Sequence, residues 1–281
     1  RFTVAIGSAP CALPAEKGAD ADVLLPPVTL RARAVDSAPP AAAVRTRSNP
    51  RDGAEMAWVP AGHFLMGSPG GEGNPDESPQ RSVYLDGYWI YRHPVTVVRY
   101  RAFCEATGRA MPKLPDDSAG GDHPVFNVSW HDAAAYAAWA GAALPTEAQW
   151  EKAARGGDGR RYPWGDAWDP DRCVSDERTH GALRYGTRPV GSCPGGASPC
   201  GALDMAGQVW EWTADWYAPD AYRAMFDRNP AGPDRGEMKV LRGGSLNWNG
   251  WHNRSAHRMP VPPHQSGWIW TGFRCVVAEA E

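Results

Sequence analysis

The chain has 281 residues, of which 42% are hydrophobic, and its formal net charge is −3. This length suits one large domain, or one domain with an appendage. The mild charge argues against nucleic acid and against an anionic membrane surface as partners, and the sequence has no apolar run near the ~20 residues of a membrane span. Because the first residue is Arg1, we expect a fragment or a processed chain, and the sequence leaves its localisation open.

Glycine, proline and tryptophan are the unusual part of the composition. There are 31 Gly, 27 Pro and 14 Trp residues. Gly and Pro at this density indicate many turns and little long regular structure, while Trp supplies large packing area around which loops can close. The composition therefore predicts an irregular, loop-rich α+β fold.

Residues 1–52 differ from the rest of the sequence. They are rich in Ala, Pro and Arg and contain neither Trp nor His. The stretch from Val28 to Val35 alternates like a strand, and the Pro-rich stretch after it is typical of a tether. We therefore expect an N-terminal extension or linker, or the end of another module, over 1–52 and one domain over 53–281.

Strand patterns come first in the expected domain. Residues 56–68 predict two short strands around the turn at Pro60 and Gly62, and the alternation in 81–96 stops at Pro94. Thr96 is a fitting N-cap for a first helix that ends at Gly108. The domain therefore begins with strands and continues with a helix.

Two further helices carry capping boxes. Ser129 and Asp132 form a variant box with Asp in place of Glu, and Thr146 with Gln149 forms a second one. Gly156 is the expected stop of the last helix. Turns and short strands follow, and residues 272–277 predict a closing strand.

The cysteines form no CxxC pair, which argues against zinc knuckles and thioredoxin-like redox sites. Cys193 and Cys200 lie in a Gly/Pro-rich loop. Two interpretations stay open for them: a loop disulfide, or two separate small apolar thiols.

The segment 242–275 has the most unusual chemistry. It contains four Trp, three Asn, three His and three Pro residues, but no Lys, Asp or Glu between Leu246 and Thr271. His252, His257 and His264 are five and seven apart, with no acid among them, so we expect no metal site there. The sequons at Asn127 and Asn253 are interpreted as chance matches.

Seven phrases in order carry a family resemblance. They are MAWVPAGHFLMGS, HPVFNVSWHDAAAYAAWAG, LPTEAQWEKAARGG, YPWGDAW, GALDMAGQVWEWTADWY, VLRGGS and GFRC. Together they resemble the sulfatase-modifying-factor domain, the family of formylglycine-generating enzymes, from Glu55 to Val277. The resemblance implies an elaborated C-type-lectin-like fold. It does not settle the activity, because such a family contains copper-dependent formylglycine generators, iron sulfoxide synthases and non-catalytic modules.

The resemblance departs from the enzymes at the residues that matter. Formylglycine generators need two cysteines after the Gly-Gly-Ser of residues 243–245, and Trp248 and Asn253 stand at the corresponding positions. Soft Cu(I) needs thiolate donors, so we expect no copper. The iron-dependent relatives draw ligands from a preceding His-rich domain, which 1–52 does not supply. We expect a protein that is not an enzyme; the alternative is an iron-linked enzyme of this family that has lost the cysteine pair.

One metal site is implied by the resemblance. Asp204, Gly207, Val209 and Glu211 match the family's calcium-binding pattern. Two carboxylates and two main-chain carbonyls suit this hard cation, so structural calcium is the expectation. The alternative is an Asp-capped turn with Glu211 in a salt bridge.

The same C-terminal segment also resembles the variable proteins of diversity-generating retroelements, which are bacterial or phage proteins. In that family a reverse transcriptase replaces adenines within a C-terminal cassette on a C-type-lectin-like scaffold. The mixture of Trp, Asn, Ser and Gly is typical of a binding surface. The resemblance implies a ligand-binding protein with a variable region at 242–275, whose partner is a protein or another macromolecule. Residues 243–245, 254–256 and 272–274 would be constant.

The implied variable positions are Leu246, Asn247, Trp248, Asn249, Trp251, His252, Asn253, His257, Met259, Val261, His264, Trp268 and Trp270. Trp248 and Trp251, in an Asn/Gly loop, are expected to be exposed. Trp268 and Trp270 alternate on a predicted strand, and their side chains could equally lie in the core or on the surface.

Overall fold

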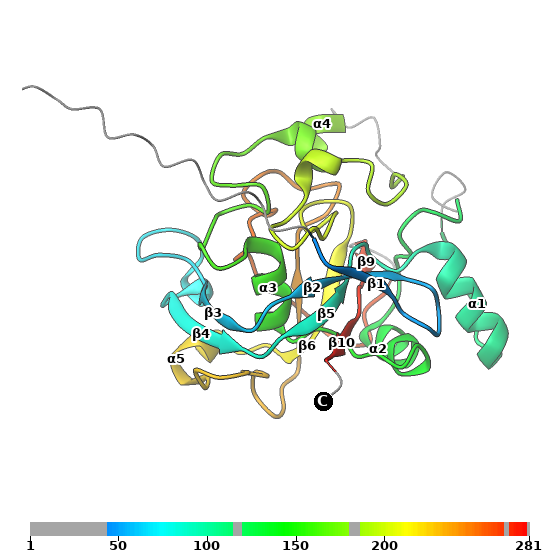
Figure 1. Ribbon diagram of the computed structural model, residues 1–281, viewed down its shortest axis with the longest axis horizontal. Coiled ribbons are helices and arrows are strands. Elements are labelled where there is room, and N and C mark those ends of the chain that lie inside the picture. Colours follow the sequence, from blue (N-terminus) through cyan, green and yellow to red (C-terminus); the bar gives the residue numbers. More distant parts are fainter. Residues whose placement is uncertain (1–43, 115–119, 180–185, 267–269, 280–281) are drawn as a thin grey trace, which may run out of the picture. The chain divides into compact units, whose positions relative to one another are not determined.

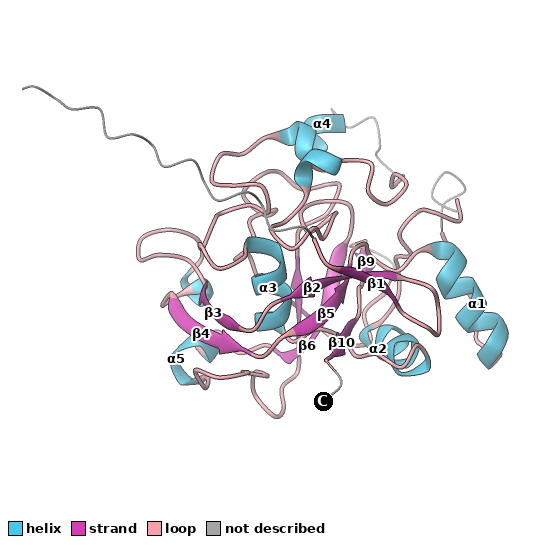
Figure 2. Ribbon diagram, in the orientation of Figure 1, coloured by secondary structure: helices cyan, strands magenta, loops and turns pink. Residues whose placement is uncertain are grey.

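The computed structural model describes residues 44–114, 120–179, 186–266 and 270–279. The strand expected from Val28 to Val35 lies outside the described residues. Most of the described residues lie in loops and turns that connect short elements (Figure 2). This is the mixed, loop-rich fold that the composition predicted.

One antiparallel sheet joins the beginning and the end of the domain. Its strand order is β1 (Thr46–Ser48), β2 (Glu55–Val59), β5 (Tyr88–Tyr91) and β10 (Val276–Ala278). Figure 1 shows β10, near the C-terminus, beside the early strands. The predicted closing strand is therefore present, although it is shorter than expected.

A second sheet contains only β3 (Gly62–Met66) and β4 (Arg81–Leu85). The third has the order β8 (Met259–Val261), β7 (Lys239–Arg242), β6 (Trp210–Trp216) and β9 (Thr271–Gly272). β7 leads into the segment 242–275, and β8 and β9 bring that segment back to the same sheet. Both ends of the segment are thereby fixed by main-chain pairing.

The three predicted helices are present: α1 (Val97–Thr107), α2 (Trp130–Trp139) and α3 (Glu147–Arg155). Both capping boxes form, at Ser129 and at Thr146. Thr96 occupies the N-cap of α1 without a side-chain hydrogen bond, and Gly108 ends this helix at φ 70°. Short helices complete the fold. Two are α-helical, α4 (Asp176–Thr179) and α5 (Ala221–Ala224), and three are 3-10 helices, η1 (Pro75–Glu77), η3 (Pro170–Arg172) and η4 (Pro194–Gly196).

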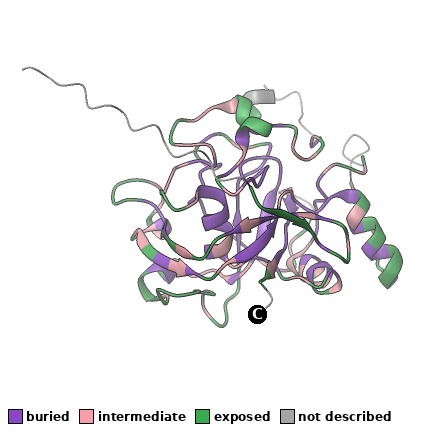
Figure 3. Cartoon of the chain, viewed as in Figure 1, coloured by how far each residue is buried: buried purple, intermediate pink, exposed green. Residues whose placement is uncertain are grey.

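The core, which Figure 3 shows as the buried centre of the domain, contains several large aromatic residues. Trp210, Trp212 and Phe273 pack with Tyr136 of α2 in one cluster. Trp150 of α3 belongs to a second cluster, which also contains residues of β2, β3, β4 and β5. Since Trp and Tyr bury large areas each, they hold together a fold with few long elements.

The structure moves the domain boundary toward the N-terminus. Residues 46–48 pair with β2, and Asn49 donates a hydrogen bond of 2.7 Å to the hydroxyl of Tyr91. Asp52 accepts hydrogen bonds from Tyr91 and Tyr136, at 2.9 and 2.6 Å. Residues 46–52 therefore belong to the domain rather than to the linker that was expected up to residue 52.

The Cys193–Cys200 alternative is also decided. Cys200 carries a free thiol, which lies 3.3 Å from the hydroxyl oxygen of Ser198. No disulfide therefore joins Cys200 to Cys193, and the interpretation as two separate thiols fits the structure.

Candidate functional site: the segment 242–275

Four buried arginines anchor the segment. Arg242, Arg254, Arg258 and Arg274 are each at most 2% exposed. Each bonds to a buried carboxylate from another part of the protein: Arg242 to Glu151, Arg254 to Glu77, Arg258 to Glu147 and Arg274 to Glu211. We call these four pairs the arginine frame. The pairs of Arg254, Arg258 and Arg274 are bidentate. Such pairs set both distance and orientation, so the frame fixes where the segment runs.

The pair of Arg254 and Glu77 illustrates the geometry. Two guanidinium nitrogens of Arg254 lie 2.6 and 2.8 Å from the two carboxylate oxygens of Glu77. Ser68 donates a further hydrogen bond of 2.6 Å to the same carboxylate. Burial opposes ionisation of Glu77, but hydrogen bonds from His257, Arg254 and Ser68 outweigh it and hold the pKa of Glu77 far below its usual value. Glu77 is therefore an ionised, fixed partner.

The same arrangement holds Arg258. Its Nε and one terminal nitrogen lie 2.7 and 3.0 Å from the oxygens of Glu147, the first residue of α3. Burial opposes ionisation, yet the charges of Arg258 and Arg242 lower the pKa of Glu147. A missing partner would leave a buried charge uncompensated, which is costly. The anchoring of the segment and the stability of α3 are therefore linked.

Between the anchored ends, the backbone reaches the surface at residues 247–252, which we call the tip loop. Asn247, Asn249 and Trp251 are exposed, and Trp251 is 42% exposed. Trp248 and His252 are half-buried. The expectation for Trp251 is thus confirmed, whereas Trp248 is only partly exposed because its ring packs against the core.

Four of the thirteen implied variable positions are buried. Leu246, Asn253, His257 and Val261 are between 0% and 6% exposed, so the expectation that they contact a ligand does not fit the structure. The reason is packing, because small volume changes are felt at buried positions. Leu246 and Val261 belong to hydrophobic clusters, His257 lies 3.6 Å from Glu77, and Asn253 bonds to the carbonyl of Trp248. Of the remaining positions, Met259 is half-buried and His264 is exposed.

Of the alternating strand predicted from Trp268, the structure describes the part from Trp270 onward, and Trp270 itself is not in a strand. Trp270 has φ 56°, which is unusual for a residue other than glycine. Its ring centroid lies 4.6 Å from that of Phe126, and it is half-buried. Trp270 therefore belongs mainly to the packing, while Trp268 lies outside the described residues.

The tip loop rests on an aromatic support. The rings of Tyr162, Trp164 and Trp168 pack against one another with centroids 5.1 to 5.8 Å apart. A Cβ on Gly250 would lie 2.6 Å from the ring of Trp168, which explains why glycine occupies this position. The backbone N–H of Gly250 donates to Glu177 at 3.2 Å. The loop is therefore supported from beneath.

Trp248 and His252 of the tip loop form a row of rings with His257. The ring centroid of Trp248 is 4.2 Å from that of His252, and His252 is 5.1 Å from His257. Burial, followed by the nearby charges of His257 and Arg254, lowers the pKa of His252 to about 4. His252 is thus neutral at pH 7 and acts as a packing and hydrogen-bonding side chain.

Copper does not fit this site. At Trp248 and Asn253, where the resemblance implies the cysteines of formylglycine generators, a Trp ring offers no ligand atom, and the Asn253 amide donates a hydrogen bond of 3.2 Å to the carbonyl of Trp248. No cysteine occurs between Ser245 and Cys275. Among the described residues, no group of three or more His, Cys, Asp or Glu side chains is placed to hold a metal ion.

The residues of the implied calcium pattern do not fit calcium with Glu211 as a ligand. Arg274 bonds to both oxygens of Glu211 at 2.7 Å, and Trp150 donates to one of them at 2.7 Å. Asp204 accepts the Gly191 N–H at 2.7 Å, and burial raises the pKa of Asp204 to about 6. The arrangement matches the salt-bridge alternative. The carbonyl of Val174 approaches Gly207 so closely that a Cβ would lie 2.2 Å from its oxygen. Val209 is a core residue.

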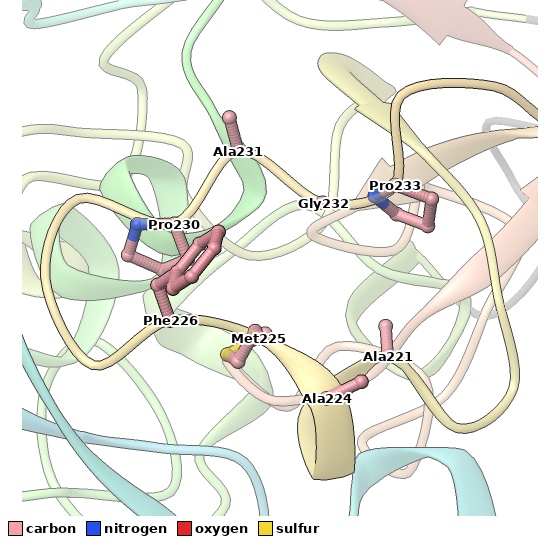
Figure 4. Close-up of a pocket in the computed structure, with 8 residues that line it drawn as sticks. All are labelled: Ala221, Ala224, Met225, Phe226, Pro230, Ala231, Gly232 and Pro233. Atoms are coloured by element: carbon pink, nitrogen blue, oxygen red, sulfur yellow. The ribbon is translucent and has the colours of Figure 1, made fainter.

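An apolar pocket lies at another place on the domain. It has a volume of about 170 Å³ and includes Phe226, which is 83% exposed. None of the residues labelled in Figure 4 has an ionisable side chain, so the pocket offers no catalytic group.

None of the helices in the described ranges has both the length and the apolar character needed to cross a membrane.

Comparison with known proteins agrees with this architecture. The model of the "Sulfatase-modifying factor enzyme 1-like domain" matches residues 41–279. The formylglycine-generating enzyme of Streptomyces coelicolor is 36% identical, and the match covers 86% of this chain and 96% of that protein. The protein is thus similar in sequence to this formylglycine-generating enzyme over nearly the whole domain.

Two solved structures share the fold. The structure of PvdO from Pseudomonas aeruginosa has a TM-score of 0.71 and 28% identity, and the match covers 83% of this chain and 98% of that one. The Treponema denticola variable protein 1 has a TM-score of 0.68 and 20% identity, with 84% and 99% covered. The second likeness speaks for the fold alone. From the family match and the Streptomyces relative together, the chain belongs to the sulfatase-modifying factor enzyme 1-like family.

Proposed function

We propose that this protein binds a ligand and presents the tip loop as a changeable contact surface, as a variable protein of a diversity-generating retroelement does. One observation carries the proposal: the exposed tip loop lies between segments held by the arginine frame. Asn247, Asn249 and Trp251 are exposed, whereas residues 253–258 immediately after the loop are all buried. A rigid frame around an exposed loop permits side-chain replacement without loss of the fold.

The composition of the exposed positions supports binding rather than catalysis. Trp supplies contact area at a low cost in conformational entropy, and Asn supplies adaptable hydrogen bonds. Trp is also a frequent hot-spot residue in protein interfaces. The partner would be a protein or another macromolecule.

Restricted randomisation tests the proposal at the protein level. We would randomise positions 247, 249 and 251 in one library and 253, 255 and 257 in a matched library, then measure the folded fraction of each. The proposal predicts that most members of the first library fold and most members of the second do not. Equal sensitivity of the two libraries would contradict it.

An enzyme of this family, linked to iron, is the second candidate. It is favoured by the relationship to the Streptomyces formylglycine-generating enzyme. It is also favoured by polar side-chain atoms near residues 245–253 that are buried without a hydrogen-bond partner, the hydroxyl of Ser245 and the carbonyl of Asn253. Elemental analysis of the purified protein separates the candidates: stoichiometric iron or copper supports the enzyme and contradicts the binding proposal.

A further inference from the structure

A pocket beside the tip loop has an arginine whose charge is not matched. It has a volume of about 270 Å³, and three arginines line it: Arg155, Arg161 and Arg254. The volume has room for a small charged group and the first carbons that carry it. Arg254 also lies 4.2 Å from the ring centroid of Trp251, so the pocket adjoins the exposed end of the tip loop.

Two of these arginines are already neutralised. Arg254 pairs with Glu77, and Arg155 pairs with Glu151 at 2.7 Å. Arg155 also donates to the carbonyl of Gly67 at 2.7 Å and to that of Gly159 at 2.5 Å. These two guanidinium groups are engaged within the protein and form a wall of the pocket.

Arg161 is different. In the described ranges of the sequence no carboxylate lies within ion-pair distance of its guanidinium, and its Nε is buried without a hydrogen-bond partner. A buried N–H without an acceptor costs free energy, and such a group in a native structure calls for an explanation.

The backbone of Arg161 is nevertheless fixed. Its N–H donates to Asp166 at 3.0 Å, and its carbonyl accepts the N–H of Ser255 at 2.9 Å. Ser255 lies in the anchored segment directly after Arg254. The backbone of Arg161 is therefore held against the arginine frame, so that the main chain need not be ordered when the guanidinium receives a ligand.

The surrounding charges select among anions. Glu72 and Asp166 also line the pocket, and both are exposed. Their negative charges oppose a dianion such as phosphate more strongly than a monoanion. The planar guanidinium fork matches a carboxylate in geometry. Because both acids are exposed, water and salt screen their charges more than that of the half-buried Arg161, and the anion that the Arg161 fork fits is a single carboxylate.

We infer that the pocket around Arg161 binds a carboxylate group of the ligand whose other contacts are made by the tip loop. The inference rests on the proposed function for the identity of that larger surface. A carboxylate on a macromolecular ligand has two sources, a polypeptide C-terminus and an Asp or Glu side chain. Both present the same chemistry to Arg161.

The test uses the full 281-residue protein and short peptides followed by titration NMR at the Arg161 Nε–H resonance. Acetyl-Ala-Ala-Ala with a free carboxylate represents a C-terminus, and acetyl-Ala-Glu-Ala-amide represents a side chain. Acetyl-Ala-Gln-Ala-amide is the uncharged control, and inorganic phosphate is the dianion control. Saturable binding of at least one carboxylate peptide is expected, and the tighter of the two identifies the source.

The variants are Arg161→Gln and, as the matched control, Arg160→Gln, whose guanidinium is already paired with Asp158. Arg161→Gln should weaken carboxylate binding about tenfold or more, since a charge-assisted pair is lost, while Arg160→Gln leaves it unchanged. For Arg161→Gln, binding is followed at the Ser255 amide. Tighter binding of phosphate, equal binding of the uncharged peptide, an unaffected Arg161→Gln variant or no saturable binding would each overturn the inference. None of these results bears on whether the tip loop is diversified, so the two proposals fail separately.

Discussion

The guanidinium of Arg254 lies 4.2 Å from the ring centroid of Trp251, while its terminal nitrogens bond to the buried carboxylate of Glu77. One residue thus belongs to the frame and also positions an exposed aromatic ring. The Nε of Arg254 donates a further hydrogen bond of 2.8 Å to the carbonyl of Trp251. The direction in which Trp251 faces is therefore set by a buried ion pair.

Truncation of two tryptophans should separate surface from core. Trp251→Ala should change the free energy of unfolding by less than about 1 kcal/mol, the value of one exposed cation–π contact. Trp210→Ala, at a residue that is 0% exposed, should cost roughly 3–5 kcal/mol. Urea unfolding of both variants measures the difference, and similar losses would show that Trp251 is a packing residue.

Removal of one member of a frame pair should be severe. Arg254→Met leaves the Glu77 charge buried without its partner, which costs roughly 3–5 kcal/mol. The double variant Arg254→Met with Glu77→Gln should recover part of that loss, because the uncompensated charge is gone. A double-mutant cycle by urea unfolding measures the coupling; additive losses would show that the two residues act independently.

Asp215 should make stability depend on pH. Burial and then the charge of Glu147 raise the pKa of Asp215 from 3.8 to about 7. Between these values the unfolded protein has lost this proton and the folded protein keeps it, so this group's contribution to stability falls as pH rises. The loss is ~1.4 kcal/mol per pKa unit.

Asp215→Asn provides the check for this prediction. It keeps an oxygen that accepts the Glu147 N–H, at 2.7 Å in the parent protein. Relative to the parent, the variant should gain free energy of unfolding as pH rises from 3.8 toward 7. Parallel stability curves for the two proteins across this range would contradict the shifted pKa.

Calcium should have little effect on stability. Since Arg274 occupies both oxygens of Glu211, the melting temperature should be the same in millimolar calcium chloride and in EGTA. A ligand that binds only the folded protein would raise the melting temperature through mass action. An increase of several degrees would therefore restore the calcium interpretation.

Local features were predictable from the sequence, whereas long-range pairings were not. The capping boxes at Ser129 and Thr146 formed as predicted, because a capping box depends on residues three apart. The pair of Arg254 and Glu77 joins residues 177 apart in sequence, and no local rule links them. The burial of His257 and Asn253 was not predictable for the same reason, since nothing local in an Asn- and His-rich stretch shows which of its side chains find buried partners.

An irregular backbone conformation was a second feature that the sequence did not predict. The sequence predicts a strand through Trp270, but this residue has φ 56° and packs against Phe126, a tertiary contact that overrides the local pattern. The pocket at Arg161 had no sequence signal either. A charge without a partner is visible only when the neighbours of the guanidinium are in place.

If an anchored frame carries a diversified loop, the gene's own locus should record it. Sequencing of that locus should find a near-identical repeat of the 3′ coding end beside a reverse-transcriptase gene, with differences at the codons of Asn247, Asn249 and Trp251. The codons of Arg254, Arg258 and Arg274 should be identical in both copies. A locus without such a repeat, or differences spread evenly over frame and loop codons, would contradict the account.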